Sequence, residues 1–414
     1  MKSWKTLFCS LFVAALFFWA AAAPAEEVVI GYSGPLSGPA AEYGQDCVNG
    51  VDMAVKELNA AGGITVKGKK YTFRLERLDD RVDPTQAVNN ARRFVAQYKT
   101  PVVFNSIATT IGPLIRVNET KGSEFLVAGY SSVHAHHTLG NKLVINPCPN
   151  FLSYIAAKSD IAWRKGYRNG AMVVTLGAYG DAWRKYFRAA WEKKGGKIVG
   201  DFPANYYTET DFSAQLASAI NTKADFLLIG GPSATTALVV EQARGMGFKG
   251  GMIVIDQARM DYIAHVLNNM KLMEGIIGIA NIADLPLPAS IGFAKKYKTA
   301  YKKAATWESA LNYNTMHIVA KAMVVAGSVE DPYAIRAAVS KALPILGDKY
   351  PNELFSVEEN GVMNAAGVIQ SVENGKFSKV DYTFAFPKTK ADFEKFRKMS
   401  KTRESENCRW LPVQ

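Results

Sequence analysis

The stretch that decides the fold is EEVVIGYSGPLSGPAAEYGQDCVNGVDMAVKELNAAGG, residues 26–63. Its β-branched run at residues 28–30 predicts a strand. The apolar residues that follow recur at three- and four-residue spacing, which predicts one face of a helix: Val48, Val51, Val55 and Leu58. The pair Gly62-Gly63 marks the end of that helix. A strand followed by a helix is the repeating unit of parallel α/β sheets.

The same unit recurs up to about residue 150. Alternating apolar residues between Tyr71 and Leu75 predict a second strand, and Asp83-Pro84 supplies an N-cap and a first-turn proline for the next helix. Further apolar runs at residues 102–104 and 125–127 enclose a shorter helix. The first 150 residues therefore predict a parallel sheet with helices on both faces.

A second α/β set begins after Pro147-Cys148-Pro149, where the prolines suit a linker. It has apolar runs at residues 172–174, 226–229 and 252–255. Residues 291–343 then change to consecutive helices without strands between them. Such helices need an earlier lobe to pack on, so the chain is expected to cross between lobes more than once.

The length of 414 residues also favours two lobes, because a single core stops growing at about 250–300 residues. Residues 387–414 contain few apolar positions, and we expect an exposed C-terminal extension there. The predicted boundaries are 1–25 for a signal peptide, 26–146 and 284–355 for the N-terminal lobe, 147–283 and 356–386 for the C-terminal lobe, and 387–414 for the extension.

The first 25 residues have the pattern of a secretory signal peptide. Lys2 and Lys5 precede an apolar run over residues 7–22, and Ala23-Pro24-Ala25 supplies the small residues of a cleavage site. We therefore expect an exported, periplasmic protein without a membrane anchor. Cleavage would leave 47 basic against 37 acidic residues, a net charge of +10 that attracts anions. Because the basic residues are scattered, nucleic acid is not an expected partner.

Three cysteines remain after residue 25, namely Cys47, Cys148 and Cys408. Export permits disulfides, yet an odd number leaves at least one thiol without a partner in the same chain. Which of them pair, if any, stays open at this point. Their wide separation lacks the Cys-x-x-Cys spacing of metal sites.

Polar side chains gather where the predicted strands end. Parallel sheets hold ligands at the carboxyl ends of their strands, which indicates a cleft between the two lobes. The residues at these positions are Ala108, Thr109, Thr110, Ser131, Ser132, Tyr179, Pro232, Ser233, Asp256 and Gln257. For any one of them, capping of the next helix is the alternative interpretation.

Motifs along the chain match one known family as an ordered set. They are LSGPAAEYG at 36–44, NAAGGI at 59–64, Asp79-Asp80 with Asp83-Pro84, Asp211-Phe212-Ser213, Gly230-Gly231, and Gln242-Ala243-Arg244 with Gly247. From about residue 28 to about 386 the chain resembles the periplasmic substrate-binding proteins of branched-chain amino-acid-type ABC transporters. The resemblance implies a type I periplasmic-binding-protein fold, in which two Rossmann-like lobes with parallel sheets are joined by three hinge crossovers.

The resemblance also implies ligand contacts. In the first lobe they fall on Tyr43 and on the residues at 108–110 and 131–132, and in the second lobe on Tyr179 and Asp256. The chain departs from the family at Pro232-Ser233, where the Leu/Ile/Val-binding relative has a tyrosine. That relative's disulfide has no counterpart, because Val82 and Ile107 stand at its positions.

The residue types suit a solute that carries a carboxylate. Hydroxyls and backbone N–H groups at strand ends and helix N-termini favour negative charge, so Thr109, Thr110, Ser131 and Ser132 are our candidate anion clamp. Asp256 is expected to pair with an ammonium group, with a helix N-cap as the alternative. Tyr43 and Tyr179 are expected to cover the apolar part of the solute, or to be partly buried aromatic residues.

Metal, cofactor and catalytic sites are not expected. His134, His136 and His137 lie close together, yet no carboxylate or cysteine lies nearby in the sequence to complete a metal site. No nucleophile and base can be nominated, so we expect no enzyme. We expect a monomeric receptor that captures a small carboxylate-bearing solute, an amino acid first, and delivers it to an inner-membrane ABC permease. The alternatives are an aromatic or short organic acid or amide as the solute, or a signalling receptor as the partner.

Overall fold

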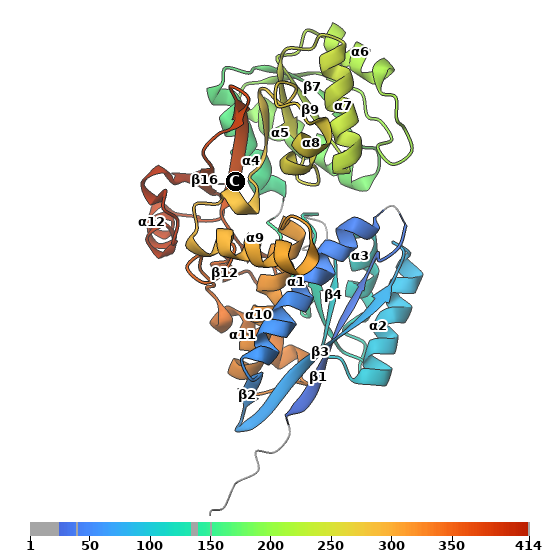
Figure 1. Ribbon diagram of the computed structural model, residues 1–414, viewed down its shortest axis with the longest axis vertical. Coiled ribbons are helices and arrows are strands. Elements are labelled where there is room, and N and C mark those ends of the chain that lie inside the picture. The colour runs from blue at the N-terminus through green and yellow to red at the C-terminus, as the bar shows by residue number, and fades with distance from the viewer. Residues whose placement is uncertain (1–24, 39, 134–139, 150, 413–414) are drawn as a thin grey trace, which may run out of the picture.

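The computed structural model describes residues 25–38, 40–133, 140–149 and 151–412 of the chain. Figure 1 shows two α/β lobes, with α1 and α2 in the lower one and α5 to α8 in the upper one. Among the described residues, no helix is both long enough and apolar enough to cross a membrane.

The N-terminal lobe is built on a six-stranded sheet that is parallel except for its edge strand β2. In spatial order its strands are β2 (Ile64–Val66), β3 (Lys69–Asp79), β1 (Glu26–Gly34), β4 (Val102–Asn105), β5 (Leu126–Gly129) and β6 (Val144–Ile145). Its first helices are α1 (Ala41–Ala60), α2 (Pro84–Tyr98) and α3 (Ala108–Val117). As predicted, Asp83 caps α2 by accepting a hydrogen bond from the Gln86 backbone N–H.

The C-terminal lobe is built on a larger mixed sheet. Its main path runs β17 (Arg409–Trp410), β16 (Asp381–Phe384), β14 (Gly367–Glu373), β11 (Ile276–Ile279), β10 (Gly251–Val254), β9 (Phe226–Gly230), β7 (Asn169–Val174) and β8 (Lys197–Asp201), and β15 (Lys376–Phe377) pairs with β14. The helices of this lobe are α4 (Phe151–Arg164), α5 (Ala178–Lys193), α6 (Ser213–Asn221), α7 (Ser233–Gly245) and α8 (Met260–Leu267). Two buried clusters cover the two faces of this sheet.

Three helices return the chain to the N-terminal lobe after the short helix η2 (Ile282–Asp284). They are α9 (Pro288–Tyr301), α10 (Trp307–Ala326) and α11 (Pro332–Ala342). Helix α10 packs along α1, and Gly50 allows this approach because a Cβ there would lie 2.1 Å from the Ser309 backbone oxygen. The strand-free block predicted at 291–343 is thus an integral part of this lobe.

The chain crosses from one lobe to the other at three places. These are the segment from β6 to α4, the segment from β11 to η2, and residues 364–367. The short strands β12 (Ser356–Val357) and β13 (Met363–Asn364) pair with each other, and Asn146 bridges to Val362 beside β6. The chain joins the second sheet at β14, later than the boundary expected at residue 356. The apolar spacing before residue 364 does not reveal this local pairing.

The C-terminal segment is packed against both lobes, which corrects the expectation of an exposed extension. Helix α12 (Lys390–Met399) buries Phe393, and β17, after the turn η3 (Ser405–Asn407), pairs with β16. Figure 1 places α12 beside the junction of the lobes. Its few apolar residues are enough because Phe393 and Phe396 join an aromatic cluster with Phe355 and Phe384.

Glu353 connects this segment with both lobes. Its carboxylate accepts hydrogen bonds from the Tyr382 hydroxyl at 2.8 Å, from the Ser400 hydroxyl at 2.5 Å and from the Lys401 backbone N–H at 2.7 Å. It also accepts one from the Gly347 N–H in the N-terminal lobe. A buried carboxylate with this many donors fixes the position of all the segments that supply them.

Candidate functional site

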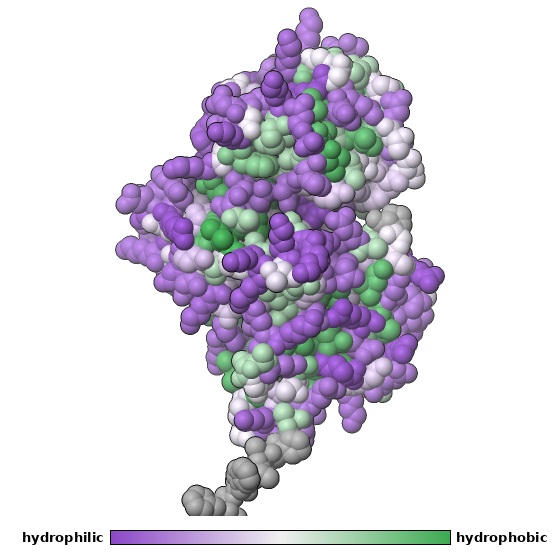
Figure 2. Space-filling view, viewed as in Figure 1, coloured by the Kyte–Doolittle hydropathy of each residue, from purple (hydrophilic) through white to green (hydrophobic). Residues whose placement is uncertain are grey.

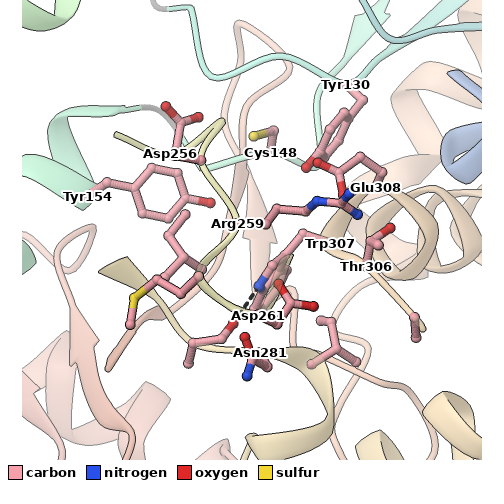
Figure 3. Close-up of a pocket in the computed structure, with 16 residues that line it drawn as sticks. Tyr130, Cys148, Tyr154, Asp256, Arg259, Asp261, Asn281, Thr306, Trp307 and Glu308 are labelled. Atoms are coloured by element: carbon pink, nitrogen blue, oxygen red, sulfur yellow. Dashed lines mark hydrogen bonds between the residues drawn. The ribbon is translucent and has the colours of Figure 1, made fainter. Parts of the chain in front are cut away.

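A small cavity that opens to solvent lies where the lobes meet. Segments of both lobes and of two of the passages between them line it. The lining residues are Tyr130, Cys148, Tyr154, Asp256, Ala258, Arg259, Met260, Asp261, Ile279, Ala280, Asn281, Ile282, Ala305, Thr306, Trp307 and Glu308 (Figure 3). The mixture of aromatic rings and charged groups is typical of a small-molecule site.

Asp256 lines this cavity, but its carboxylate already has partners within its own lobe. Oδ1 accepts a hydrogen bond from the Tyr179 hydroxyl and a second from Trp183 Nε1, the latter at 2.7 Å. The ammonium group of the fully buried Lys158 is an electrostatic neighbour, and it donates to the Val254 carbonyl at 2.6 Å. Asp256 therefore has two hydrogen-bond donors and a neighbouring cation within its own lobe.

Burial lowers the pKa of Lys158 to about 7, because the charged ammonium loses its hydration, and the nearby Asp256 carboxylate opposes this change. The rings of Trp183 and Tyr154 lie 5.2 and 5.6 Å from the Lys158 nitrogen and give partial compensation. Asp256 does not cap a helix either, since α8 begins at Met260 with Arg259 at its N-cap.

Arg259 connects the lobes at the rim of the cavity. It follows β10 in the C-terminal lobe, and its guanidinium reaches Glu42 at 3.2 Å and Asp46 at 3.3 Å on α1. Lys303 provides Asp46 with a second cation at 2.6 Å. The Asp46 side chain is only 1% exposed, so these contacts neutralise a charge that water does not reach. In the view of Figure 2, both hydrophilic and hydrophobic residues lie at the outer surface where the two lobes adjoin.

Glu308 contributes a second buried carboxylate, from the first turn of α10. A capping box of Thr306 and Ser309 starts this helix and fixes where Glu308 lies. Glu308 is 5% exposed, and among the described residues its Oε2 atom has no hydrogen-bond partner. The Thr306 side chain and the backbone N–H of Glu308 donate to the carboxyl group. Desolvation raises the pKa of this carboxyl, while Arg259 opposes the rise. Figure 3 shows Glu308 beside Tyr130 and Arg259.

The candidate anion clamp lies at the carboxyl ends of β4 and β5. Thr109 is exposed on the first turn of α3, beside the half-buried Ala108. The Thr110 hydroxyl is already used, because it donates to Asn105 Oδ1 at 2.8 Å. Ser131 and Ser132 are buried directly after Tyr130, and the Ser131 hydroxyl accepts from the Val133 N–H. Tyr130 in turn contacts the ring of Tyr43 at 6.1 Å between centroids.

The remaining predicted residues of the C-terminal lobe support the loop after β10. The Ser233 hydroxyl accepts from the Arg259 N–H at 2.9 Å and donates to the Gln257 carbonyl at 3.3 Å. The Gln257 N–H donates to the Tyr179 hydroxyl, while its buried side-chain oxygen has no hydrogen-bond partner in the part of the chain that the structure describes. Of the predicted site residues, only Asp256 lines the cavity itself.

Cys47, Cys148 and Cys408 are free and buried, and desolvation raises the pKa of each thiol. Cys148 lines the cavity. Within the described ranges, no cluster of three or more His, Cys, Asp or Glu side chains has the arrangement of a metal site. His134, His136 and His137 lie outside the described residues.

The sequence reasoning missed Tyr130, Tyr154, Arg259, Trp307 and Glu308 as lining residues. One signal for Glu308 was available. It lies directly after Thr306-Trp307 and is the single acidic residue of the helix that runs to Ala326. A lone acidic residue at the start of a helix is usually read as a favourable partner of the helix dipole, so its burial in a cavity was not apparent.

Comparison with known proteins identifies relatives over most of the chain. The Leu/Ile/Val-binding protein homolog 1 of Brucella melitensis biotype 1 is 26% identical over 385 residues, which cover 91% of this chain and 99% of that protein. The Leu/Ile/Val-binding protein of Escherichia coli strain K12 is 28% identical over 232 residues, which cover 54% of this chain and 60% of that protein. The chain thus spans less than two thirds of the second relative.

A solved structure supports the same fold. A leucine-binding protein from Thermotoga maritima superposes with a TM-score of 0.72 at 23% identity, and covers 85% of this chain and 98% of its own. The expected type I fold and the resemblance to branched-chain amino-acid-type binding proteins are confirmed. The family and the fold are those of substrate-binding proteins. A family model described as periplasmic binding protein matches residues 27–376, and the chain belongs to that family.

Proposed function

We propose that this protein is a periplasmic receptor that captures a small carboxylate-bearing solute between its lobes and delivers it to an inner-membrane ABC permease. The observation that carries the proposal is the cavity at the lobe junction, which residues from both lobes line. A solute held there contacts both lobes at once, and its binding therefore favours the closed arrangement of the lobes. An amino acid is the first choice, because the Brucella and Escherichia coli relatives are Leu/Ile/Val-binding proteins by name.

The carboxylate of the solute is assigned to the ends of β4 and β5, beside the cavity rather than in its lining, where the lining residue Tyr130 directly follows β5. Among the described residues, the backbone N–H groups of Ala108 and Thr109 at the start of α3 have no helical acceptor, and Thr109 and the segment Ser131-Ser132 lie at neighbouring strand ends. Thr110 offers the solute no free donor, because its hydroxyl donates to Asn105 Oδ1 and its backbone N–H donates to the Ile107 carbonyl.

A thermal-shift screen of the purified protein against amino acids and against aromatic and short organic acids tests the proposed solute class. A ligand at 100 times its dissociation constant stabilises the folded state by about 2.7 kcal/mol, which such a screen resolves. If none of the carboxylate-bearing compounds stabilises the protein, the proposal is contradicted. Loss of solute uptake on deletion of the gene tests the delivery step.

Calorimetry with the best compound then tests the clamp. Thr109→Ala and Ser132→Ala are each expected to weaken binding by roughly 1–3 kcal/mol, because the solute carboxylate loses a hydrogen-bond donor. Ser218→Ala removes a hydroxyl on α6 that donates to the Ala214 carbonyl, and serves as the matched control. Unchanged affinity in both clamp variants would show that these hydroxyls do not bind the solute.

A further inference from the structure

The C-terminal segment forms a fourth connection between the lobes, in addition to the three crossings. After the third crossing the chain runs through β14 and β16 in the C-terminal lobe. It then contacts the N-terminal lobe again at residues 401–403 and rejoins the C-terminal sheet at β17. We call residues 400–410 the strap, because they contact both lobes.

One end of the strap is bonded to the N-terminal lobe. The Lys401 N–H donates to the Glu353 carboxylate at 2.7 Å, and the Arg403 N–H donates to the Pro286 carbonyl at 2.8 Å. Pro286 lies between η2 and α9, and Glu353 is tied to its own lobe by the Gly347 N–H. Both acceptors therefore move with the N-terminal lobe.

The other end of the strap is bonded to the C-terminal lobe. Strand β17 pairs with β16, and the Leu411 N–H continues this pairing by donating to the Phe384 carbonyl at 3.0 Å. The Arg409 guanidinium donates to Asp381 on β16 at 2.6 Å and to Asp160 on α4. Charge-assisted contacts from one guanidinium to two carboxylates fix its position as well as contribute energy.

Little free chain separates the two ends. Residues 404–408 lie between them, and three of these form the turn η3. The Asn407 N–H donates to the Glu404 carbonyl at 2.9 Å, and the Arg397 guanidinium of α12 donates to the Ser405 carbonyl at 3.3 Å. Because these bonds close the turn, the two ends of the strap cannot move apart unless one of them detaches or the turn opens.

The strap lies to one side of the lobe junction. Figure 1 shows α12, which leads into the strap, beside the junction and away from α3. Rotation of two lobes about a hinge needs changes of φ and ψ at only a few residues of the crossings. A further contact beside those crossings restricts the rotation, because each of its ends moves with a different lobe.

We propose that the strap limits the rotation of the two lobes about the three crossings, and that Arg409 and the contacts of Ser400 and Lys401 with Glu353 are its anchors. The strap favours the arrangement in which both of its ends are bonded. Release of either end therefore widens the range of lobe arrangements that the protein samples. This inference concerns the protein alone and does not depend on the solute that it binds.

The first test variant releases the strap from the C-terminal lobe. Arg409→Gln removes the guanidinium from Asp160 and Asp381. Arg164 binds the same two carboxylates from α4, at 3.0 and 2.7 Å, so both keep a cation in this variant. Arg164→Gln is the matched control, because it removes the same kind of contact from the same carboxylates and leaves the strap in place.

The second variant loosens the other end. Ser400→Ala removes a hydroxyl that donates to Glu353 and accepts from the Thr402 N–H. Its control is Ser340→Ala, which removes an exposed hydroxyl on α11 that donates to the Ala337 carbonyl. Melting temperatures establish that all four variants are folded.

Limited proteolysis with trypsin measures release of the strap. Lys401 and Arg403 are exposed cleavage sites, but a protease cuts there only after the surrounding backbone has detached. Each strap variant is expected to raise the rate of cleavage at these two residues by about 3- to 10-fold, because partly exposed charge-assisted contacts are lost. Both controls are expected to be cleaved at the wild-type rate.

Electron–electron double resonance then measures the movement of the lobes. Spin labels are attached at Ala96→Cys on α2 and Ala189→Cys on α5, two exposed alanines in different lobes. Every labelled protein also carries Cys408→Ser, so that the strap itself takes up no label. We expect one narrow distance in the reference protein and in both controls, and its loss to a broad distribution in both strap variants.

Broadening in each variant that releases the strap supports the proposal. Faster cleavage with an unchanged distance distribution would overturn it, because a released strap would then not restrain the lobes. Wild-type cleavage in both strap variants would show that these contacts are not anchors, which also overturns the proposal. Equal broadening in Arg164→Gln and Arg409→Gln would assign the effect to the carboxylates on α4 and β16 instead of the strap.

Discussion

Replacement of Lys158 by methionine should change how the stability of the protein depends on pH. The pKa of this buried lysine falls from an ordinary value of 10.5 to about 7 in the folded state. Each pKa unit corresponds to about 1.4 kcal/mol, so burial of the charged form costs the folded state at most about 5 kcal/mol. Below about pH 7 the lysine is charged in both states, and this cost is present in full.

Between pH 7 and the ordinary lysine pKa of 10.5, which applies to the unfolded chain, the unfolded chain binds up to one more proton than the folded protein. The unfolding free energy therefore rises with pH, by up to about 1.4 kcal/mol per pH unit. Other groups contribute with the opposite sign, since the pKa values of the buried thiols Cys47 and Cys148 are raised. The difference between wild type and Lys158→Met cancels those contributions and isolates the lysine.

The assay is urea unfolding followed by tryptophan fluorescence at a series of pH values. From about pH 7.5 to 9.5 the wild type is expected to gain about 2.5 kcal/mol relative to Lys158→Met. Lys185→Met, at an exposed lysine, controls for the loss of one formal charge. Parallel curves for wild type and Lys158→Met over this range would refute the argument that burial controls this ammonium group.

Two further predictions concern the contacts around α1. Gly50→Ala should lower the melting temperature and reduce the free energy of unfolding by about 1–3 kcal/mol, because the added Cβ would meet the Ser309 carbonyl. Gly292→Ala is the control, because a Cβ at Gly292 would meet nothing within 4 Å. Arg259→Gln should destabilise the protein by about 2 kcal/mol through loss of a charged contact with Asp46, and should enlarge the radius of gyration in small-angle scattering. An unchanged radius would show that this contact does not hold the lobes together.

The sequence predicted the parts of the fold that depend on local patterns. The apolar runs at residues 102–104 and 252–255 fall in buried strands because parallel strands are covered on both faces. The Asp83-Pro84 start of α2 was readable because capping uses neighbouring residues. The last strand β17 has two residues, and its pairing with β16 depends on a contact that no local pattern encodes.

The candidate site was predicted less completely for the same reason. Asp256 was found because it ends a strand, but its hydrogen bond to Trp183 and its neighbour Lys158 come from helices 73 and about 100 residues away in the sequence. Glu308 belongs to a helix of the other lobe, so its presence in the same cavity follows only from the way in which the lobes meet. The polar residues at strand ends can thus be predicted from the sequence, whereas the groups that neutralise a buried charge cannot.

The pairing of β17 with β16 also bears on aggregation. An uncovered outer strand presents free N–H and C=O groups to which a strand of another molecule can add. Here two residues, Arg409 and Trp410, occupy that position, and Arg409 also hydrogen-bonds to Asp381 on β16. A product cleaved anywhere in residues 387–408 would retain the sheet but lose this cover. Such a product would be prone to form intermolecular β-structure, although every residue of its cavity would still be present.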